Sequence, residues 1–177
     1  FRILLRGGDG MLAQDFLSVL DQFPEFECYA PLRNELDITN QEQVESIIKN
    51  YKPEILLNCA AYTKVDKSET ESAIAFSING TSVGKLAEAC HRSGVKIVHL
   101  STDFVFDGSN RAPVTEYNCT APLGVYGESK RDGEARIEAI DADWLTVRSS
   151  WLIAAHGNNF VRTMLRLGSE RNEIKVV

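Results

Sequence analysis

The sequence predicts an α/β fold: a doubly wound parallel β-sheet with helices on both faces. Three observations support this prediction. Short apolar runs alternate with segments of helical periodicity along the chain. These runs are apolar throughout, which is typical of strands buried on both faces. The chain of 177 residues, with 44% apolar and 25% charged side chains, has the length and composition of one globular domain.

Strands are predicted where apolar runs end at glycine, proline or polar residues, because runs of this length are too short for surface helices. They are expected at residues 2–5, 26–30, 54–58, 95–100, 144–148 and 174–177. The last strand would be cut by the end of the chain, and the first residue is Phe1 instead of Met. We therefore expect residues 1–177 to be one domain of a longer chain.

Helices are predicted where apolar residues recur every three or four positions. They are expected at residues 10–20, 40–52, 72–93, 125–140 and 158–171. Thr39 or Asn40 is expected to cap the second helix, Pro53 to break it, and Gly94 to end the third. Residues 107–123 are expected to form a loop because they contain glycine, asparagine and proline.

Charge and cysteine content exclude several classes of function. The chain has 19 Lys and Arg residues against 25 Asp and Glu residues, and the net charge of −6 argues against a nucleic-acid partner. The apolar runs fall well short of the roughly 20 residues that span a membrane, and no targeting segment is recognisable. The four cysteines lack metal-ligand spacing. We expect them to be reduced and mostly buried in a cytoplasmic protein.

A glycine-rich turn follows the first predicted strand. Residues 7–13 read GGDGMLA and fit G-x-x-G-x-x-A, with Gly7, Gly10 and Ala13 at the fixed positions. Such a turn directs the N-terminus of a helix at a pyrophosphate, while Gly10 allows close approach of the backbone and Ala13 allows the helix to pack. The pattern predicts a Rossmann-type NAD(P)-binding domain over residues 1–177. The alternative is an ordinary turn between a strand and a helix.

The segment after the second strand bears on the choice of cofactor. The acidic residue that usually binds a ribose 2′-hydroxyl there is missing, and YAPLR stands at residues 29–33. Arg33 is placed to meet a 2′-phosphate, which would favour NADPH over NADH. The alternative is a solvated arginine in a loop. Asp37 and Ile38, just beyond, are candidates to line the adenine.

A tyrosine and a lysine are spaced by one helical turn. Tyr126 and Lys130 form the pattern Y-x-x-x-K, which places a phenol and an ammonium group on one face of a helix. A free phenol has a pKa of about 10, and a neighbouring cation lowers that value. We expect Tyr126 to exchange a proton with a carbonyl or an alcohol near neutral pH. The alternative is an ordinary aromatic residue at the start of a helix.

Hydroxyl groups follow the predicted strand at residues 95–100. Ser101, Thr102 and Asp103 stand there, and ligands of open α/β sheets bind beyond the carboxyl ends of strands. A Thr102 hydroxyl in this position can bind a substrate carbonyl and stabilise charge as hydride arrives. The alternative is a hydroxyl that caps a turn. Glu69, Glu71 and Glu88 are interpreted as a solvated helix face.

Taken together, these residues resemble the extended short-chain dehydrogenase/reductases, and within them the dTDP-4-dehydrorhamnose reductase family. The matching blocks occur in order along nearly the whole chain, and STD-x-VF, VYG-x-SK and GNNF-x-x-TMLRL are quite specific to this group. The matching segments are ILLRGGDGMLA (3–13), LDIT (36–39), NCAAYTKVD (58–66), LSTDFVFDG (100–108), PLGVYGESKRDGE (122–134), RSSWL (148–152) and GNNFVRTMLRL (157–167).

The resemblance implies a reductase that transfers hydride from NADPH or NADH to the C4 keto group of a dTDP-sugar. Thr102, Tyr126 and Lys130 would form the catalytic triad, with Tyr126 as proton donor. Thr102, Asp103 and Trp151 would face the sugar. Further positions would bind the cofactor: Gly10, Met11 and Leu12 along the pyrophosphate, Asp37 and Ile38 beside the adenosine, and Ala60, Ala61 and Tyr62 in the groove after the third strand.

The chain also departs from the family pattern. Arg6 stands where a small or hydroxylic residue is common, and IAA at residues 153–155 replaces a more frequent Tyr-Gly pair near the sugar pocket. The family continues into a C-terminal substrate lobe that this chain would mostly lack. Some members bind a metal at an oligomer interface, where Asp15 is a candidate, but the sequence gives no other support for Mg²⁺. A homodimer is left open.

Two other functions compete with the reductase. A nucleotide-sugar epimerase or dehydratase of the same superfamily would keep its cofactor bound and recycle it. A non-catalytic, cofactor-binding regulatory subunit would not need the Tyr126 and Lys130 pair, which this chain retains. Stoichiometric consumption of NADPH separates the reductase from both.

Overall fold

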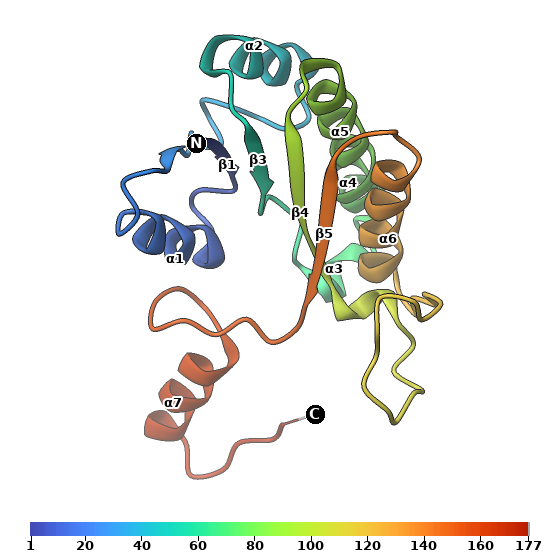
Figure 1. Cartoon of the computed structure of the whole chain (residues 1–177). Helices are drawn as coiled ribbons and strands as arrows, with labels where there is room; N and C mark the ends of the chain where they lie inside the picture. Colours follow the sequence, from blue (N-terminus) through green and yellow to red (C-terminus); the bar gives the residue numbers. More distant parts are fainter. Residues whose placement is uncertain (177) are drawn as a thin grey trace.

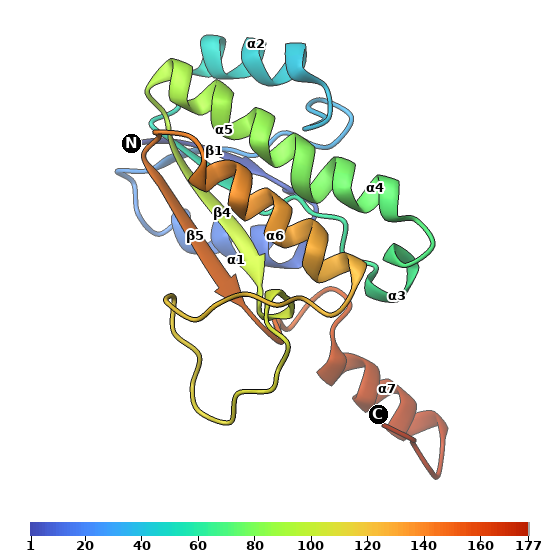
Figure 2. The ribbon, with the colours of Figure 1, turned by 90° about the vertical axis from the view of Figure 1, so that its right-hand side faces the viewer.

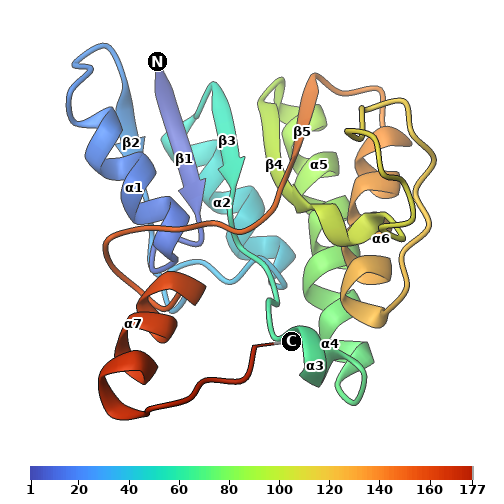
Figure 3. The same ribbon diagram turned by 90° about the horizontal axis from the view of Figure 1, so that it is seen from below.

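The structure, a computed structural model that describes residues 1–176, contains a five-stranded sheet in the order β2-β1-β3-β4-β5. All neighbouring strands are parallel, and Figure 3 shows them side by side in this order. The strands are β1 (Arg2–Arg6), β2 (Glu27–Tyr29), β3 (Ile55–Asn58), β4 (Lys96–Thr102) and β5 (Trp144–Ser149). The predicted α/β class and the first five predicted strands are confirmed.

Helices cover both faces of the sheet, as predicted for a doubly wound fold. Helix α1 (Met11–Leu20) packs on one face (Figure 1). The other face carries α2 (Gln41–Tyr51), α4 (Ser72–Phe76), α5 (Ser82–Ser93) and α6 (Val125–Glu138), as Figure 2 shows. Successive residues of a strand point to opposite faces. Leu4 therefore joins the core beneath α2, α5 and α6, and Leu5 joins the core beneath α1.

The register of the strands brings their carboxyl ends to one edge. Arg6 pairs with Asn58, and Asn58 pairs with His99. Strand β4 continues to Thr102, which lies opposite Ser149 of β5. Because all strands point the same way, the segments that follow them meet at this edge. The glycine turn and the Ser-Thr-Asp segment are thereby placed at the same edge of the sheet.

The helix predicted over residues 72–93 is interrupted by a π-helical turn, η1 (Ser77–Thr81), between α4 and α5. Helix α6 packs so closely on this turn that a Cβ atom at Gly133 would lie 2.2 Å from the carbonyl oxygen of Asn79. A π-turn changes which side chains face a neighbour and often marks a functional site. Hydrophobic spacing along the chain does not show this irregularity, which lies at the close contact with α6.

Two short helices were not predicted, α3 (Val65–Ser68) and the 3₁₀ turn η2 (Asp103–Val105). The interpretation of Glu69, Glu71 and Glu88 as a solvated helix face is confirmed for Glu88, which is exposed on α5, whereas Glu69 and Glu71 lie between α3 and α4. Glu69 Oε1 accepts a hydrogen bond from the N–H of Val125 at 2.9 Å, and this contact caps the start of α6. Glu71 Oε2 accepts one from the hydroxyl of Tyr62 at 2.5 Å.

The strand predicted at residues 174–177 is wrong for residues 174–176, which have no regular structure, and Val177 lies outside the described residues. Helix α7 (Phe160–Glu170) carries this segment below the ends of the strands in Figure 1. A strand needs a neighbour for its backbone hydrogen bonds, and at this position none is paired with it within residues 1–176.

All four cysteines are free in the part of the chain that the structure describes. Cys90 is buried, Cys28 and Cys59 are half-buried, and Cys119 is exposed. The prediction that the thiols are mostly buried is therefore confirmed for Cys90 alone, and Cys119, which lies in the loop at residues 107–123, contradicts it outright. This loop packs little against the core because it is polar and rich in turn-forming residues.

Candidate active site

A cleft of about 700 Å³ lies where the strands end. Its lining comes from the glycine turn after β1, the segments after β2, β3 and β5, the end of β4, and helix α6. Most of the predicted cofactor residues and the predicted tyrosine and lysine pair line this one cleft. They are Gly7, Gly10, Met11, Leu12, Arg33, Asp37, Ile38, Ala60, Ala61, Tyr126 and Lys130.

The glycine turn forms one end of the cleft. Gly7 has a left-handed backbone with φ of 84°, and a Cβ atom there would lie 2.8 Å from the backbone nitrogen of Ala60. The Gly10 N–H donates to the Gly7 carbonyl at 2.8 Å, which closes the turn. Within residues 1–176, no side chain caps α1 and its first turn holds no acidic residue. Its N–H groups are therefore available to an anion.

A buried arginine braces the segment after β2. The Arg6 side chain is almost fully buried and donates to the carbonyl oxygens of Pro31, at 2.7 Å, and Leu36. Its Nε finds no partner among the described residues, and burial lowers the pKa of Arg6 to about 10. The departure from the family pattern at Arg6 thus has a structural role. It holds the loop that presents Arg33 and Asp37.

Tyr126 and Lys130 lie one turn apart near the start of α6, as predicted. Lys130 is 2% exposed, and its Nζ donates to the carbonyl oxygen of Leu100 at 2.6 Å. Burial lowers the pKa of Lys130 to about 8, while Glu134 and Cys59 act in the opposite direction.

The expectation that Lys130 lowers the pKa of Tyr126 is wrong for this structure. Burial raises the pKa of the phenol, the charge of Asp103 raises it further, and a hydrogen bond with Thr102 only partly offsets them. The reason is that Tyr126 is largely removed from water, which disfavours the phenolate. Lys130 meanwhile turns its amine to the Leu100 carbonyl.

Four predicted residues lie outside the lining of the cleft in the described structure: Tyr62, Thr102, Asp103 and Trp151. Thr102 Oγ1 accepts from the N–H of Phe104 at 3.2 Å and donates to Asp103 Oδ1 at 3.1 Å. Trp151 is 68% exposed and has a left-handed backbone with φ of 51°. The Thr102 side chain interacts with the Tyr126 phenol, whereas the Trp151 ring packs edge-on against Phe160 of α7.

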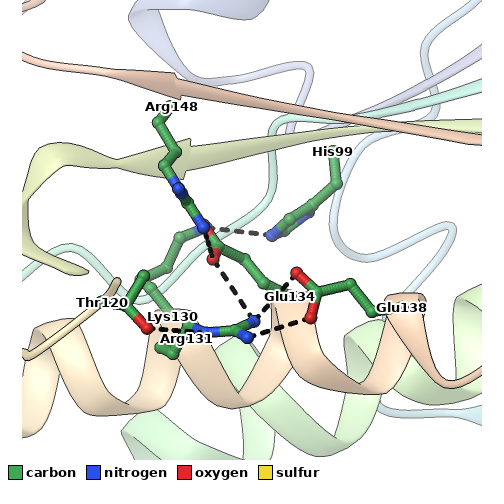
Figure 4. Close-up of polar contacts among 7 residues, drawn as sticks. All are labelled: His99, Thr120, Lys130, Arg131, Glu134, Glu138 and Arg148. Atoms are coloured by element: carbon green, nitrogen blue, oxygen red, sulfur yellow. Dashed lines mark hydrogen bonds and ion pairs between the residues drawn. The ribbon is translucent and has the colours of Figure 1, made fainter. Parts of the chain in front are cut away.

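Helix α6 is fixed by an ion-pair network that the sequence did not indicate (Figure 4). Glu134 is fully buried and binds the guanidinium of Arg148 on β5 through two hydrogen bonds of 2.9 and 2.7 Å. Arg131 lies 3.5 Å from Glu134 and also pairs with Glu138 at 2.9 Å. The network joins α6, and with it Tyr126 and Lys130, to the edge strand. The only sequence signal is an arginine in the apolar run WLTVR.

Asn79 of the π-turn is a second missed residue. Its Nδ2 donates to Ser129 Oγ and to the Tyr62 carbonyl, both at 3.0 Å. Its Oδ1 accepts from the Tyr62 N–H at 2.8 Å. Ser129 in turn donates to the carbonyl of Tyr126 at 2.8 Å. This buried amide thus couples the segment after β3 to the turn that carries the tyrosine.

Within residues 1–176, no group of three or more His, Cys, Asp or Glu side chains is arranged to hold a metal ion. Asp15 lies 3.7 Å from His156 Nδ1. Across the same described residues, no helix combines the length and apolar character that crossing a membrane requires.

Comparison with known proteins agrees with this geometry. The family model described as the RmlD substrate binding domain matches residues 1–177. The chain belongs to this family. One relative, the dTDP-4-dehydrorhamnose reductase of Burkholderia thailandensis, is 43% identical over 180 residues, which cover 99% of this chain and 58% of the relative.

Solved structures of the family share the fold closely. The dTDP-4-dehydrorhamnose reductase of Bacillus anthracis, in complex with NADP, superimposes with a TM-score of 0.94 at 39% identity and covers 98% of this chain. The corresponding protein of Clostridium acetobutylicum gives a TM-score of 0.95 at 38% identity and covers all of this chain. The chain spans 61% and 62% of these two proteins.

Proposed function

We propose that the chain is the cofactor-binding and catalytic part of a dTDP-4-dehydrorhamnose reductase. It would reduce the C4 keto group of dTDP-4-dehydro-L-rhamnose to the alcohol of dTDP-L-rhamnose, with NADPH or NADH as hydride donor. One observation carries the proposal: Tyr126 and Lys130 line the same cleft as the glycine turn. The names of the 43% identical relative and of the NADP complex support it.

The cleft fits a dinucleotide. A Cβ atom at Gly7 would lie 2.8 Å from Ala60 N in the segment after β3, and one at Gly10 would lie 3.0 Å from the Gly7 carbonyl oxygen, so both positions require glycine for the turn to pack closely. The uncapped N-terminus of α1 suits a pyrophosphate. Arg33, Asp37 and Ile38 would hold the adenosine end, and Ala60 and Ala61 the groove between. Tyr62 would act only by holding this groove in place, because its hydroxyl donates to Glu71 and its N–H and carbonyl are bound by Asn79.

Bound NADPH or NADH would supply the hydride. Because its pKa is raised, the Tyr126 phenol keeps its proton at neutral pH and can donate it to the carbonyl oxygen. The Thr102 hydroxyl, which lies beside Tyr126, would polarise the same oxygen. Lys130, which lines the same cleft, would hold the nicotinamide ribose. Asp103 and Trp151 would contact the sugar.

The free cysteines of the described chain fit a reducing compartment, and the proposal places the enzyme in the cytoplasm. The intact protein, incubated with dTDP-4-dehydro-L-rhamnose, is expected to consume one NADPH for each dTDP-L-rhamnose formed. Absorbance of NADPH and chromatography of the sugar measure the ratio. Conversion of a dTDP-sugar without net NADPH loss would indicate an epimerase or dehydratase, and binding of NADPH without turnover a regulatory subunit.

Arg33→Ala is expected to weaken binding of NADPH about tenfold, because a guanidinium is the strongest side-chain partner of a phosphate. Binding of NADH, which has no 2′-phosphate, should change by less than about twofold. Fluorescence titration with each nucleotide measures both constants. Arg111→Ala, a change outside the cleft lining, is the matched control. An equal loss of affinity for NADPH and for NADH would contradict a contact between Arg33 and the 2′-phosphate.

A further inference from the structure

A buried chain of hydrogen bonds leads to Lys130 from the backbone after β3. Asn58 Oδ1 accepts from the Ala60 N–H at 3.2 Å, and Asn58 Nδ2 lies 3.0 Å from His99 Nδ1. On the other side of the ring, His99 Nε2 lies 3.4 Å from Lys130 Nζ, a contact drawn in Figure 4. Asn58 and His99 are both 0% exposed. They are register partners of β3 and β4, so the sheet fixes their separation.

This chain determines where the histidine proton lies. The N–H of Ala60 is only a donor, so Asn58 turns its oxygen toward it and its NH₂ group toward His99. His99 Nδ1 must then accept, which places the ring proton on Nε2. Burial, and after it the charge of Lys130, lower the pKa of His99 well below its usual value. The ring is therefore neutral, with its N–H directed at the lysine.

A donor directed at an amine favours one protonation state. An ammonium group has only donors, so a charged Lys130 would oppose its own N–H to that of His99, whereas a neutral amine accepts the hydrogen bond. A hydrogen bond to the neutral form disfavours the charged form. The other contact of Lys130 Nζ, with the Leu100 carbonyl, is open to both forms.

We propose that Asn58 and His99 are positioning residues that favour the neutral form of Lys130, His99 through its Nε2–H and Asn58 by locking that tautomer. The importance of the His99 tautomer for catalysis rests on the proposed function. The tautomer and the state of the amine are properties of the protein alone. They can be measured without substrate or cofactor.

Other charged and titratable groups face the same amine. Glu134 on α6 and Cys59 after β3 favour the charged form of Lys130, against burial. Arg148 on β5 pairs with Glu134 and weakens its attraction for the amine. Tyr126 lies one turn earlier on α6 and is held protonated by burial. The His99 N–H and burial both favour the neutral amine of Lys130, whereas Glu134 favours the ammonium form.

The first test is the tautomer in the unmodified chain. Long-range ¹H–¹⁵N correlation spectra of the cofactor-free protein are expected to show His99 protonated at Nε2 and unprotonated at Nδ1 from about pH 6 to pH 9. A ring proton on Nδ1 would overturn the proposal. Because no turnover is involved, this result is independent of whether the protein reduces a keto sugar.

The second test reverses the tautomer of His99. Asn58→Asp offers His99 an acceptor, so the proton moves to Nδ1 and Nε2 presents its lone pair to Lys130. We expect Lys130 to bind its proton about tenfold more tightly, a rise of about one pH unit in the titration of its ¹⁵Nζ resonance. The new carboxylate also acts directly by its charge. His99→Phe, combined with Asn58→Asp, separates the two effects.

In the His99→Phe background we expect Asn58→Asp to shift the lysine titration by less than about a third of the shift that it causes beside His99. An equal shift in both backgrounds would mean that the carboxylate acts by charge alone, and would overturn the proposal. Thermal unfolding of each variant establishes that it is folded. Should a variant fail to fold, the tautomer of the unmodified protein still decides the matter.

Discussion

Tyr126→Phe is expected to lower kcat of the intact enzyme by about 10²- to 10⁴-fold, the usual contribution of a positioned acid. The substitution removes one hydroxyl and keeps the ring, which packs edge-on against Phe104 with centroids 5.5 Å apart. Affinity for NADPH should change by less than about twofold, because the proton is required only as hydride reaches the carbonyl carbon. Oxidation of NADPH in the presence of dTDP-4-dehydro-L-rhamnose measures kcat, and fluorescence titration measures binding.

Tyr117→Phe is the matched control, since this tyrosine lies in the loop at residues 107–123 and is 88% exposed. It should leave kcat unchanged. A kcat for Tyr126→Phe within a few-fold of the unmodified enzyme would assign the proton to another group. A comparable loss in both variants would point to a general disturbance of the loop and α6.

Glu134→Gln is expected to lower the free energy of unfolding by about 2–3 kcal/mol. Breaking a buried ion pair leaves an uncompensated charge and usually costs about 3–5 kcal/mol. The expectation here is smaller because the side chain of Arg148 is 21% exposed and water screens part of its charge. Glutamine keeps the volume of the side chain, so the loss reports charge and hydrogen bonding. Urea unfolding, followed by circular dichroism, measures it.

Glu138→Gln provides the control, because Glu138 binds the same Arg131 at 2.9 Å but is itself 39% exposed. An exposed pair contributes less than about 1 kcal/mol. Equal losses in the two variants would show that burial of Glu134 adds nothing. If Glu134→Gln lost activity without losing stability, the main role of Glu134 would be its charge acting on Lys130.

Local patterns explain why much of the fold was predictable. Each of the first five strands is a contiguous apolar run, and the glycine turn and the Tyr126 and Lys130 pair are short, contiguous motifs. The strand expected at residues 174–177 failed for the described residues 174–176, because an apolar run becomes a strand only beside a partner. The helix expected over residues 72–93 missed η1, because hydrophobic spacing does not distinguish a π-turn from the α-helix on either side of it.

Much of the cleft's lining was predictable, although Tyr62, Thr102, Asp103 and Trp151 lie outside it, but the electrostatics of the cleft was not. The sequence placed Tyr126, Lys130 and the glycine turn in one cleft, since residues after parallel strands share an edge. It gave the wrong direction for the pKa of Tyr126, because burial depends on the surrounding helices and loops. In the sequence, Glu134 does not differ from any other carboxylate on a helix. Its ion pair with Arg148 depends on a contact between α6 and β5, which are separate elements.

By itself, the sequence determined the parallel α/β architecture, the dinucleotide turn and the tyrosine and lysine spacing, because each depends on residues that are neighbours in the chain. Only the tertiary structure decided the bracing of the loop by Arg6, the contacts of Asn79 and the placement of His99 between Asn58 and Lys130. These depend on residues from separate elements, such as Asn58, His99 and Lys130. Folding brings such groups together and removes water from around them. Their hydrogen bonds and charges then interact more strongly than they would in water.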